Sequence, residues 1–301
     1  MNQFDRLFSL SGLSLDRLRT FLRVAEAGNL SKAAQGDVTK QSQYSRQIKE
    51  LESYFGVALT RRVGRRIEIT PEGRQLALVI RRQFSEMDDF RESMSGRSVN
   101  VRFGSQGSVI DWLMVPRLSG VRAALGKAMV ELEQMRSADV VRSVEDGRLD
   151  FGIVRDDAVP AEMKRWRLGV VGYSLFATKA HWKGQTSVEK IIDRVPFAEL
   201  LSGGQFTDRW HQWLASQRLV PQVFARVSSF TDLAMVVKAG HAAAVLPDLA
   251  AIDFDPKHFN QHSIPALRQR TLVLIANARS LERSGIAANV AVKLTALLKL
   301  S

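Results

Sequence analysis

Hydrophobic and polar positions alternate with two different periods along this chain, and the change comes near residue 97. Up to that point apolar side chains recur every three or four residues, which is typical of amphipathic helices. Beyond it, short apolar runs alternate with helical stretches, as in a sheet covered by helices on both faces. The pattern predicts a helical N-terminal part and a larger α/β part.

Three short helices are expected at the N-terminus. Ser14 is a candidate N-cap for the first, and Gly28-Asn29 is expected to end it. Ser31 is a candidate cap for a second helix, Gly36 supplies a turn, and a helix of about fourteen residues is expected after Thr39. Two short helices joined by a tight turn are the usual frame that places one helix in the DNA major groove.

The third helix has an apolar stripe at Tyr44, Ile48, Leu51 and Phe55 and a polar opposite face. Glutamine matches the edge of adenine, arginine matches guanine, and serine serves a base or a phosphate. A solvated helix face is the alternative, although such a face usually carries more Glu. The residues expected to contact DNA from this region are Ser31, Gln41, Ser42, Gln43, Ser45, Arg46 and Lys49.

Residues 58–70 are predicted to form two short strands whose tip carries Arg61, Arg62, Arg65 and Arg66. Four arginines on one hairpin repel each other unless they are counter-charged, and DNA phosphates or a narrow minor groove are natural partners. This hairpin would be the wing of a winged helix-turn-helix. Arg62, Arg65 and Arg66 therefore join the expected DNA contacts.

A long helix is predicted from Pro71 to about Ser95, after the capping hydroxyl of Thr70. Its apolar positions recur at intervals of three and four: Leu76, Ile80, Met87, Phe90 and Met94. Such a seam indicates pairing with a second helix, so residues 71–95 are expected to form a homo-oligomer contact. Packing within the monomer is the alternative.

Composition narrows the class of partner. The chain of 301 residues, long enough for two or three domains, carries a net charge of +12, which favours an anionic partner. Residues 38–82 hold ten Lys or Arg against four acids, so half of the net charge lies there. No cysteine, signal-peptide core or apolar run of 18 residues occurs, so we expect a cytoplasmic protein without a membrane contact.

From Val99 onward, alternating strands and helices predict a mainly parallel sheet with helices on both faces. Ligands of such folds bind at the carboxyl ends of strands and at helix N-termini, where hydroxyls and free amides suit a carboxylate. The candidate effector-binding residues are Ser105, Gln106, Gly107, Ser108, Ser137, Arg155, Ser202, Gly203, Gln205, Ser229 and Thr231. Arg155 can form a fork with an anion, although simple helix caps and a surface arginine are the alternatives.

Enzyme motifs are missing from the sequence. Gly120 and Gly126-Lys127 approach a phosphate-binding loop, but the glycine spacing is too long and no hydroxyl follows the lysine. His258 and His262 are four residues apart without further obvious ligands. We therefore expect no catalysis, no metal and no cofactor.

The N-terminal part resembles the DNA-binding domain of LysR-type transcriptional regulators. The matching residues are Ala33-Ala34, Gln41, Ser45-Arg46-Gln47-Ile48, Leu51-Glu52, Gly56, Leu59, Arg62, Thr70 and Gly73. The later part is similar to the family's effector-binding domain, a periplasmic-binding-protein-like fold. Its matching residues are Gly147–Gly152, Val227-Ser228-Ser229, Ala239-Gly240 and Leu246-Pro247. The resemblance covers residues 13–300.

The resemblance implies an α/β protein with a winged helix-turn-helix in residues 1–70, a linker and dimerisation helix in 71–97, and an effector-binding domain in 98–301. Lobe I would comprise about 98–171 and 269–301, and lobe II about 172–268. It implies a dimeric or tetrameric DNA-binding regulator with a small, anionic effector and a possible contact with RNA polymerase. A solute-binding protein of the same fold and a ligand-independent DNA-binding protein are the alternatives.

Five positions depart from the family's pattern: Asp37, Lys40, Ser42, Thr60 and Ala242. Asp37 stands where Leu is usual, Lys40 where a serine caps the recognition helix, and Ser42 where proline commonly begins it. Asp37 and Lys40 are therefore expected to change the geometry of the turn and the cap.

Overall fold

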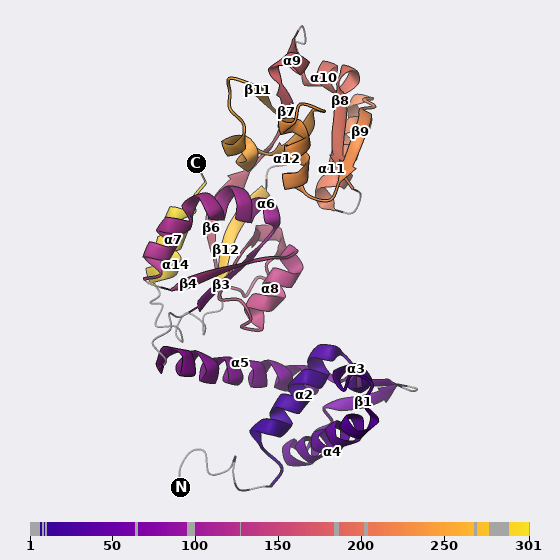
Figure 1. Ribbon diagram of the computed structural model, residues 1–301, viewed down its shortest axis with the longest axis vertical. Coiled ribbons are helices and arrows are strands. Elements are labelled where there is room, and N and C mark those ends of the chain that lie inside the picture. The colour runs from indigo at the N-terminus through magenta and orange to yellow at the C-terminus, as the bar shows by residue number, and fades with distance from the viewer. Residues whose placement is uncertain are drawn as a thin grey trace. The chain divides into compact units, whose positions relative to one another are not determined.

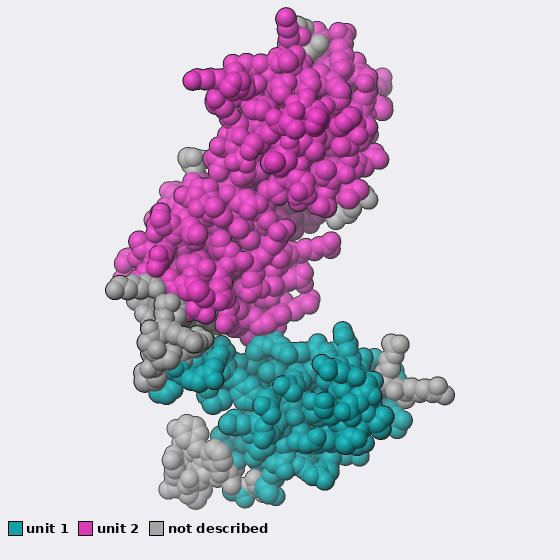
Figure 2. All heavy atoms as spheres, viewed as in Figure 1, with its two compact units in different colours: residues 1–97 teal, residues 98–301 magenta. Residues whose placement is uncertain are grey.

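The computed structural model describes residues 7, 9, 11–63, 66–94, 100–126, 128–183, 187–201, 204–267, 270–276 and 289–300. Contacts divide the chain into two compact units (Figure 2). We call residues 1–97 unit 1 and residues 98–301 unit 2. Arg65, Ser202 and Gly203, which the sequence marked as candidate contacts, lie outside the described residues.

Unit 1 opens with three helices that begin at side-chain caps: α2 (Leu15–Ala27), α3 (Leu30–Ala33) and α4 (Val38–Phe55). Ser14 caps α2, as predicted, through a 3.2 Å hydrogen bond from a first-turn amide. Asn29, not Ser31, caps α3, with its side-chain oxygen 2.7 Å from a first-turn amide. Because Gly28 alone takes the left-handed conformation that ends α2, Asn29 keeps the extended backbone that an N-cap needs.

The helix α4 begins earlier than the sequence suggested. Asp37 is its cap, because its carboxylate accepts a 3.1 Å hydrogen bond from the amide of Lys40. A carboxylate is also favoured at the positive end of the helix dipole. The helix consequently has 18 residues instead of about fourteen, and Ser42 lies in its second turn.

The predicted wing is present as the antiparallel strands β1 (Thr60–Val63) and β2 (Arg66–Ile69). Glu52 of α4 fixes its base. One carboxylate oxygen accepts hydrogen bonds of 2.9 Å from the amides of Leu59 and Thr60 and from the hydroxyl of Thr60. The threonine that departs from the family's pattern therefore ties the wing to α4.

The long helix α5 (Pro71–Met94) begins against the wing. The hydroxyl of Thr70 accepts a 2.9 Å hydrogen bond from the amide of Gly73 and donates to the carbonyl of Ala58 at 2.8 Å. A Cβ on Gly73 would lie 2.2 Å from the carbonyl oxygen of Leu59. Only glycine lets the helix approach the wing this closely.

The apolar seam of α5 divides into two parts. Its first half packs into unit 1 through Ala77 and Ile80, which are buried with Phe21, Val24, Ile48, Leu51, Leu59 and Ile69. Further along, Met87 is 47% exposed and Phe90 is 67% exposed. The expectation of one continuous seam facing a second helix is therefore wrong for the first half, because the helix must also close the core of unit 1.

Unit 2 holds a five-stranded sheet of order β4-β3-β5-β12-β6. Its strands are β3 (Asn100–Ser105), β4 (Met129–Gln134), β5 (Phe151–Arg155), β6 (Arg165–Val171) and β12 (Arg270–Ala276). The helices that cover it are α7 (Leu118–Ala124), α8 (Ser137–Glu145) and α14 (Asn289–Leu297). Figure 1 shows α8 on one face and α7 with α14 on the other. We call this part lobe I.

Both faces of this sheet are buried, as the apolar runs indicated. Ile153 and Leu274 belong to the core under α7 and α14, whereas Val154 and Val273 belong to the core under α8. The sheet is mainly parallel, as predicted, except that β12 runs antiparallel to its neighbours β5 and β6. The strand β12 enters the sheet from the rest of unit 2, so its first residues lie beside the last residue of β5.

The remainder of unit 2, which we call lobe II, contains a three-stranded antiparallel sheet of order β10-β7-β11 and a parallel pair β8-β9. Its strands are β7 (Tyr173–Thr178), β8 (Pro196–Leu200), β9 (Gln222–Val227), β10 (Ala244–Pro247) and β11 (Phe259–Ser263). Its helices are α9 (Lys179–Trp182), α10 (Val188–Arg194), α11 (Gln205–Gln217) and α12 (Phe230–Lys238). In the described part of the chain, a bridge between Phe197 and Ala243 joins the pair to the sheet.

Trp112 connects the two lobes of unit 2. It lies in a π-helical segment (Ile110–Met114) that follows the short helix α6 (Gly107–Val109) of lobe I. Trp112 packs into the lobe II core and donates a 3.1 Å hydrogen bond to Asp253. Single π-helical turns are frequent at functional sites, and this one carries the lobe contact.

Candidate DNA interface and effector cavity

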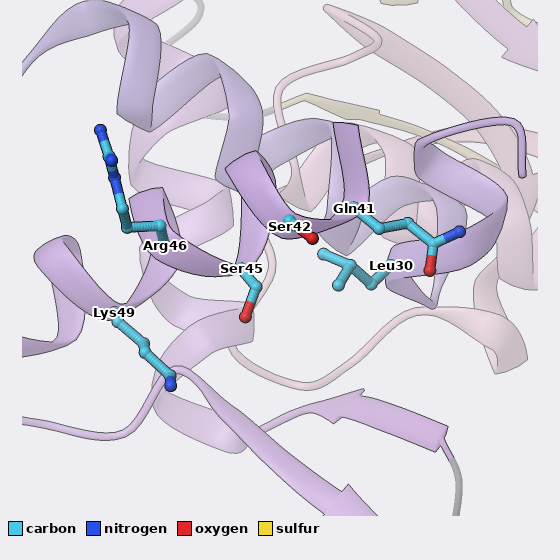
Figure 3. A pocket seen from close by; sticks show the side chains of 6 residues that line it. All are labelled: Leu30, Gln41, Ser42, Ser45, Arg46 and Lys49. Carbon is cyan, nitrogen blue, oxygen red and sulfur yellow. The ribbon is translucent and has the colours of Figure 1, made fainter. Parts of the chain in front are cut away.

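A shallow hollow of about 450 Å³ lies along the start and middle of α4. Its lining combines one apolar side chain with hydroxyl, amide and cationic groups: Leu30, Gln41, Ser42, Ser45, Arg46 and Lys49 (Figure 3). Ser42 and Arg46 are four residues apart, as are Ser45 and Lys49, so these side chains form two neighbouring rows along α4. Five of the expected DNA contacts are thus brought together around this hollow.

Two further expected DNA contacts, Ser31 and Gln43, do not line the hollow. The hydroxyl of Ser31, in α3, accepts a hydrogen bond of 3.5 Å from the side-chain amide (Nε2) of Gln41. Gln43 is exposed on α4 but does not line the hollow. Leu30 lines it and was missed from the sequence, because an apolar residue beside a helix cap looks like ordinary core.

Arg46 is positioned by a carboxylate. Its Nε lies 3.5 Å from Glu50, one turn further along α4, and Arg17 of α2 binds the same carboxylate. The side chain of Arg46 is nevertheless 82% exposed. Figure 3 shows it leaving the helix in a direction opposite to that of Ser45 and Lys49. The guanidinium is therefore paired with Glu50 on one side and open to solvent over most of its surface.

The wing arginines are not equivalent. Arg61 lies opposite Glu68 in the hairpin, and their charged groups are 3.1 Å apart. Arg62 lies opposite Ile67 and points to the other face, because side chains alternate along a strand. Arg61, which was not among the expected DNA contacts, thus has a counter-charge within the hairpin. The backbone of Arg66 is in β2, and its side chain lies outside the described part of the chain.

Unit 2 contains a cavity of about 600 Å³ between the two lobes. Predicted effector contacts that line it are Gln106, Gly107, Ser108, Ser137, Arg155, Gln205 and Ser229. They come from the starts of α6, α8, α11 and α12 and from the end of β5. Residues far apart in the sequence therefore meet at one surface, as expected for the carboxyl edge of such a sheet.

Two other predicted contacts have different surroundings. Ser105 is 2% exposed, and its hydroxyl donates a 2.7 Å hydrogen bond to the carbonyl of Ile153. It joins β3 to β5 and does not line the cavity, so its expected effector contact is corrected to a structural role. The hydroxyl of Thr231 lies 3.0 Å from that of Ser229 and is also not part of the lining.

The cavity lining is cationic. Arg136, Arg155 and Arg270 belong to it, and no acidic side chain does among the described residues. Arg270 opens β12, which pairs antiparallel with β5 so that Leu272 faces Arg155. The sequence did not reveal Arg270, because only the antiparallel return of β12 brings its first residue to the carboxyl edge of β5.

The guanidinium groups of Arg155 and Arg270 are partly buried close to each other, which disfavours their positive charges. Burial lowers the pKa of Arg270 from its usual value, and repulsion by Arg155 and Arg209 adds to the shift. Three guanidinium nitrogens, Nε of Arg155 and Nε and Nη2 of Arg270, are buried without a hydrogen-bond partner among the described residues. Asp157 lies 3.5 Å from Arg155 Nε as a partial counter-charge. Unpaired buried donors of this kind are costly unless an acceptor arrives.

Three aromatic rings form an apolar wall beside the arginines. The ring of Phe206 lies 4.7 Å from that of Tyr173 and 5.0 Å from that of Phe230. Burial raises the pKa of Tyr173, although the nearby arginines oppose the shift, so its phenol stays protonated at neutral pH. Such a wall suits the apolar part of a small organic ligand.

Comparison with known proteins identifies the family. Residues 15–74 match the family model described as "Bacterial regulatory helix-turn-helix protein, lysR family". Residues 95–291 match the model described as "LysR substrate binding domain". The chain belongs to the LysR family. It is a DNA-binding transcriptional regulator with a helix-turn-helix domain followed by the family's substrate-binding domain, and the predicted fold class is confirmed.

Curated LysR-family relatives extend over most of the chain. A probable nitrogen assimilation transcriptional activator of Synechococcus elongatus is 30% identical over 274 residues, which are 81% of this chain and 82% of the relative. An uncharacterised HTH-type transcriptional regulator, YfeR of Shigella flexneri, is 26% identical over 79% of this chain and 75% of its own length.

Solved structures share the fold. Full-length CbnR complexed with its target DNA covers 93% of this chain and 100% of its own, with 21% identity and a TM-score of 0.54. Full-length LysG of Corynebacterium glutamicum with bound effector Arg covers 93% and 99%, with 18% identity and a TM-score of 0.59. No helix in the described part of this LysR-family chain is long and apolar enough to cross a membrane. The same residues contain no group of three or more His, Asp or Glu that could hold a metal ion.

Proposed function

We propose that α4 and the wing read double-stranded DNA, with α4 in the major groove and the Arg62 face of the wing against phosphates or the minor groove. The hollow on α4 carries this proposal, because its lining combines donors that suit base edges with an apolar group that suits the thymine methyl. The proposed contacts are Ser31, Gln41, Ser42, Gln43, Ser45, Arg46, Lys49, Arg62, Arg65 and Arg66, together with Leu30. A regulator that binds the chromosome in this way acts in the cytoplasm.

Substitution of Arg46 and Lys49 tests the proposed contacts on α4. Arg46→Ala should cost about 1–3 kcal/mol at particular base pairs, measured by competition among duplexes that differ at single positions. Lys49→Ala should weaken binding to all duplexes more evenly if it contacts phosphate. Equal losses at every position for both variants would contradict a base contact by Arg46.

We propose further that two or four copies assemble through the exposed half of α5. Met87 and Phe90 support this, since large apolar side chains on a charged helix usually cover a partner. The working units would then be a winged helix-turn-helix in residues 1–70, a linker in 71–97 and an effector domain in 98–301. Two paired winged domains would bind the two halves of a pseudo-palindrome. RNA polymerase remains a proposed partner.

The cavity of unit 2 is the proposed effector site, and we infer an organic anion as its ligand. The surplus of arginine in the lining supports the charge, and the aromatic wall supports an apolar body. The ligand acts by favouring one arrangement of the subunits through its differential affinity.

Thermal unfolding against a panel of organic acids tests the effector proposal. An acid that binds should raise the melting temperature of the wild-type chain in a concentration-dependent way. Arg270→Gln should remove most of that rise, because it deletes one of the two guanidinium groups that would pair with the anion. An equal rise in the variant would show that the acid binds elsewhere.

A further inference from the structure

A glutamine occupies the place between the two arginines of the cavity. The side-chain oxygen of Gln205 accepts hydrogen bonds from Nη1 of Arg155 and, at 3.2 Å, from Nη1 of Arg270. Gln205 is the first residue of α11 in lobe II, whereas the arginines end β5 and begin β12 in lobe I. This three-residue contact therefore joins the lobes directly across the cavity.

The amide is an incomplete partner for this position. Its oxygen is neutral, so it does not cancel the repulsion between the guanidinium groups of Arg155 and Arg270. It also leaves three of their buried nitrogens without a hydrogen bond among the described residues, one of which, Nε of Arg155, has Asp157 at 3.5 Å. A carboxylate has two charged oxygens and can serve both guanidinium groups, with hydrogen bonds about twice as strong as neutral ones. The amide of Gln205 is therefore a weaker partner for the two arginines than a carboxylate would be.

The start of α11 offers the same anion a second set of donors. Its N-cap is Gly204, which has no side chain to bond the first-turn amides, while α12, at the same cavity, is capped by Ser229. The first-turn amides of a 13-residue helix, together with its dipole, favour an anion. The ring of Phe206, which follows Gln205, packs on Tyr173 and keeps this end of the helix against the cavity.

We propose that Gln205 is a built-in placeholder for the effector's anionic group, which displaces it from Arg155 and Arg270. The inference rests on the proposed anionic effector and adds how the chain responds to it. In the free protein the lobes are joined through Gln205. In the bound protein the ligand takes over the arginines, so the direct bond from α11 to lobe I is replaced by contacts through the ligand.

Variants at position 205 of the full-length chain test the placeholder. The probes are acetate, phenylacetate and sulfate, titrated against chloride at constant ionic strength, with the thermal unfolding of unit 2 as the readout. Gln205→Ala removes the competitor, so the affinity for the bound anion should rise about tenfold, the value expected when one hydrogen-bond set to a charged group no longer has to be broken. Gln217→Ala, at the other end of α11, is the matched control and should match the wild type.

Gln205→Glu supplies the carboxylate from within the chain. It should raise the melting temperature without any ligand and lower the affinity for the probe at least about tenfold, because the arginines are already paired. A glutamate at a helix start is favourable by itself, so the comparison is repeated in an Arg155→Ala background. In the Arg155→Ala background, Gln205→Glu should raise the melting temperature by less than it does in the wild-type chain.

The outcomes separate the placeholder from the effector proposal. Weaker anion binding by Gln205→Ala would make Gln205 a direct ligand of the effector and overturn the placeholder. So would equal binding by the wild type and Gln205→Ala, or a gain from Gln205→Glu that is undiminished in the Arg155→Ala background. If no probe binds to the wild type or to Gln205→Ala, the anionic effector fails and the placeholder fails with it.

Discussion

At the scale of residues, Arg61 and Arg62 are neighbours in β1 with different electrostatic surroundings. Arg61 shares its charge with Glu68, and Arg62 has a hydrophobic residue opposite it. Arg62→Ala should therefore make the negative slope of log K against log salt shallower by about one for binding to any duplex, because one phosphate contact is lost. The charge-neutral double variant Arg61→Ala/Glu68→Ala should leave that slope nearly unchanged. Equal slopes for Arg62→Ala and the wild type would remove Arg62 from the phosphate contacts.

His181 makes the stability of unit 2 depend on pH. Burial lowers the pKa of this imidazole below its usual 6.5, and its Nδ1 has no hydrogen-bond partner among the described residues. The folded chain resists protonation more than the unfolded chain does. Its contribution to stability is therefore complete above about pH 6.5 and is lost as the pH falls from there towards the lowered value.

His181→Phe should remove this dependence and leave the stability at pH 7.5 almost unchanged. All five tryptophans lie in unit 2, so urea unfolding followed by tryptophan fluorescence reports the right part of the chain. The urea midpoint should fall less between pH 7 and pH 5 for the variant than for the wild type. His258→Gln is the control, since that imidazole is 74% exposed. If both variants show the wild-type pH dependence, His181 does not cause it.

At the scale of elements, the start of α4 depends on Asp37. Asp37→Ala should cost about 1 kcal/mol of local helix stability, whereas Asp37→Ser should cost much less, because serine is also a good cap. A loss of about 1 kcal/mol corresponds to roughly fivefold faster amide hydrogen exchange in the first turns of α4. Equal exchange rates in Asp37→Ala and the wild type would mean that another group fixes the start of the helix.

The second half of α5 carries the proposed assembly contact. Phe90→Asp should reduce the oligomer size measured by sedimentation velocity, because it places a charge where the apolar side chain would be covered. Arg91→Ala, a change of an exposed residue on the same turn, should leave the size unchanged. An unchanged size in Phe90→Asp would place the contact elsewhere on the chain.

Local patterns predicted most of the elements, and the misses have physical reasons. Tyr173–Thr178 is a mostly apolar run in which only Ser174 and Thr178 are polar, so the sequence indicates β7 with its observed bounds. It did not indicate β6, which carries Arg165 and Arg167, or the half-exposed β11. Both are edge strands, where one side faces solvent and the apolar pattern is diluted. Caps were missed where Asn29 and Asp37 competed with neighbouring hydroxyl groups.

At the scale of the whole molecule, the cavity was only partly predictable. Polar residues after strands and at helix starts indicated Arg155 and Gln205 as cavity candidates, because that placement is a local property. Arg270 depends on the antiparallel return of β12 beside β5 in lobe I, and the aromatic wall depends on the packing of β7, α11 and α12 in lobe II; no local pattern encodes either. The same holds for Trp112, whose insertion into lobe II sets how the lobes meet.

The central claim is that this LysR-family chain reads a specific DNA sequence through α4. Selection of bound duplexes from a random pool, with the wild type and Arg46→Ala side by side, tests it most directly. We expect the wild type to enrich a pseudo-palindrome that it binds at least about 10³-fold more tightly than unrelated DNA. Arg46→Ala should lose preference at particular positions of each half-site. Recovery of no preferred sequence by the wild type would contradict the account.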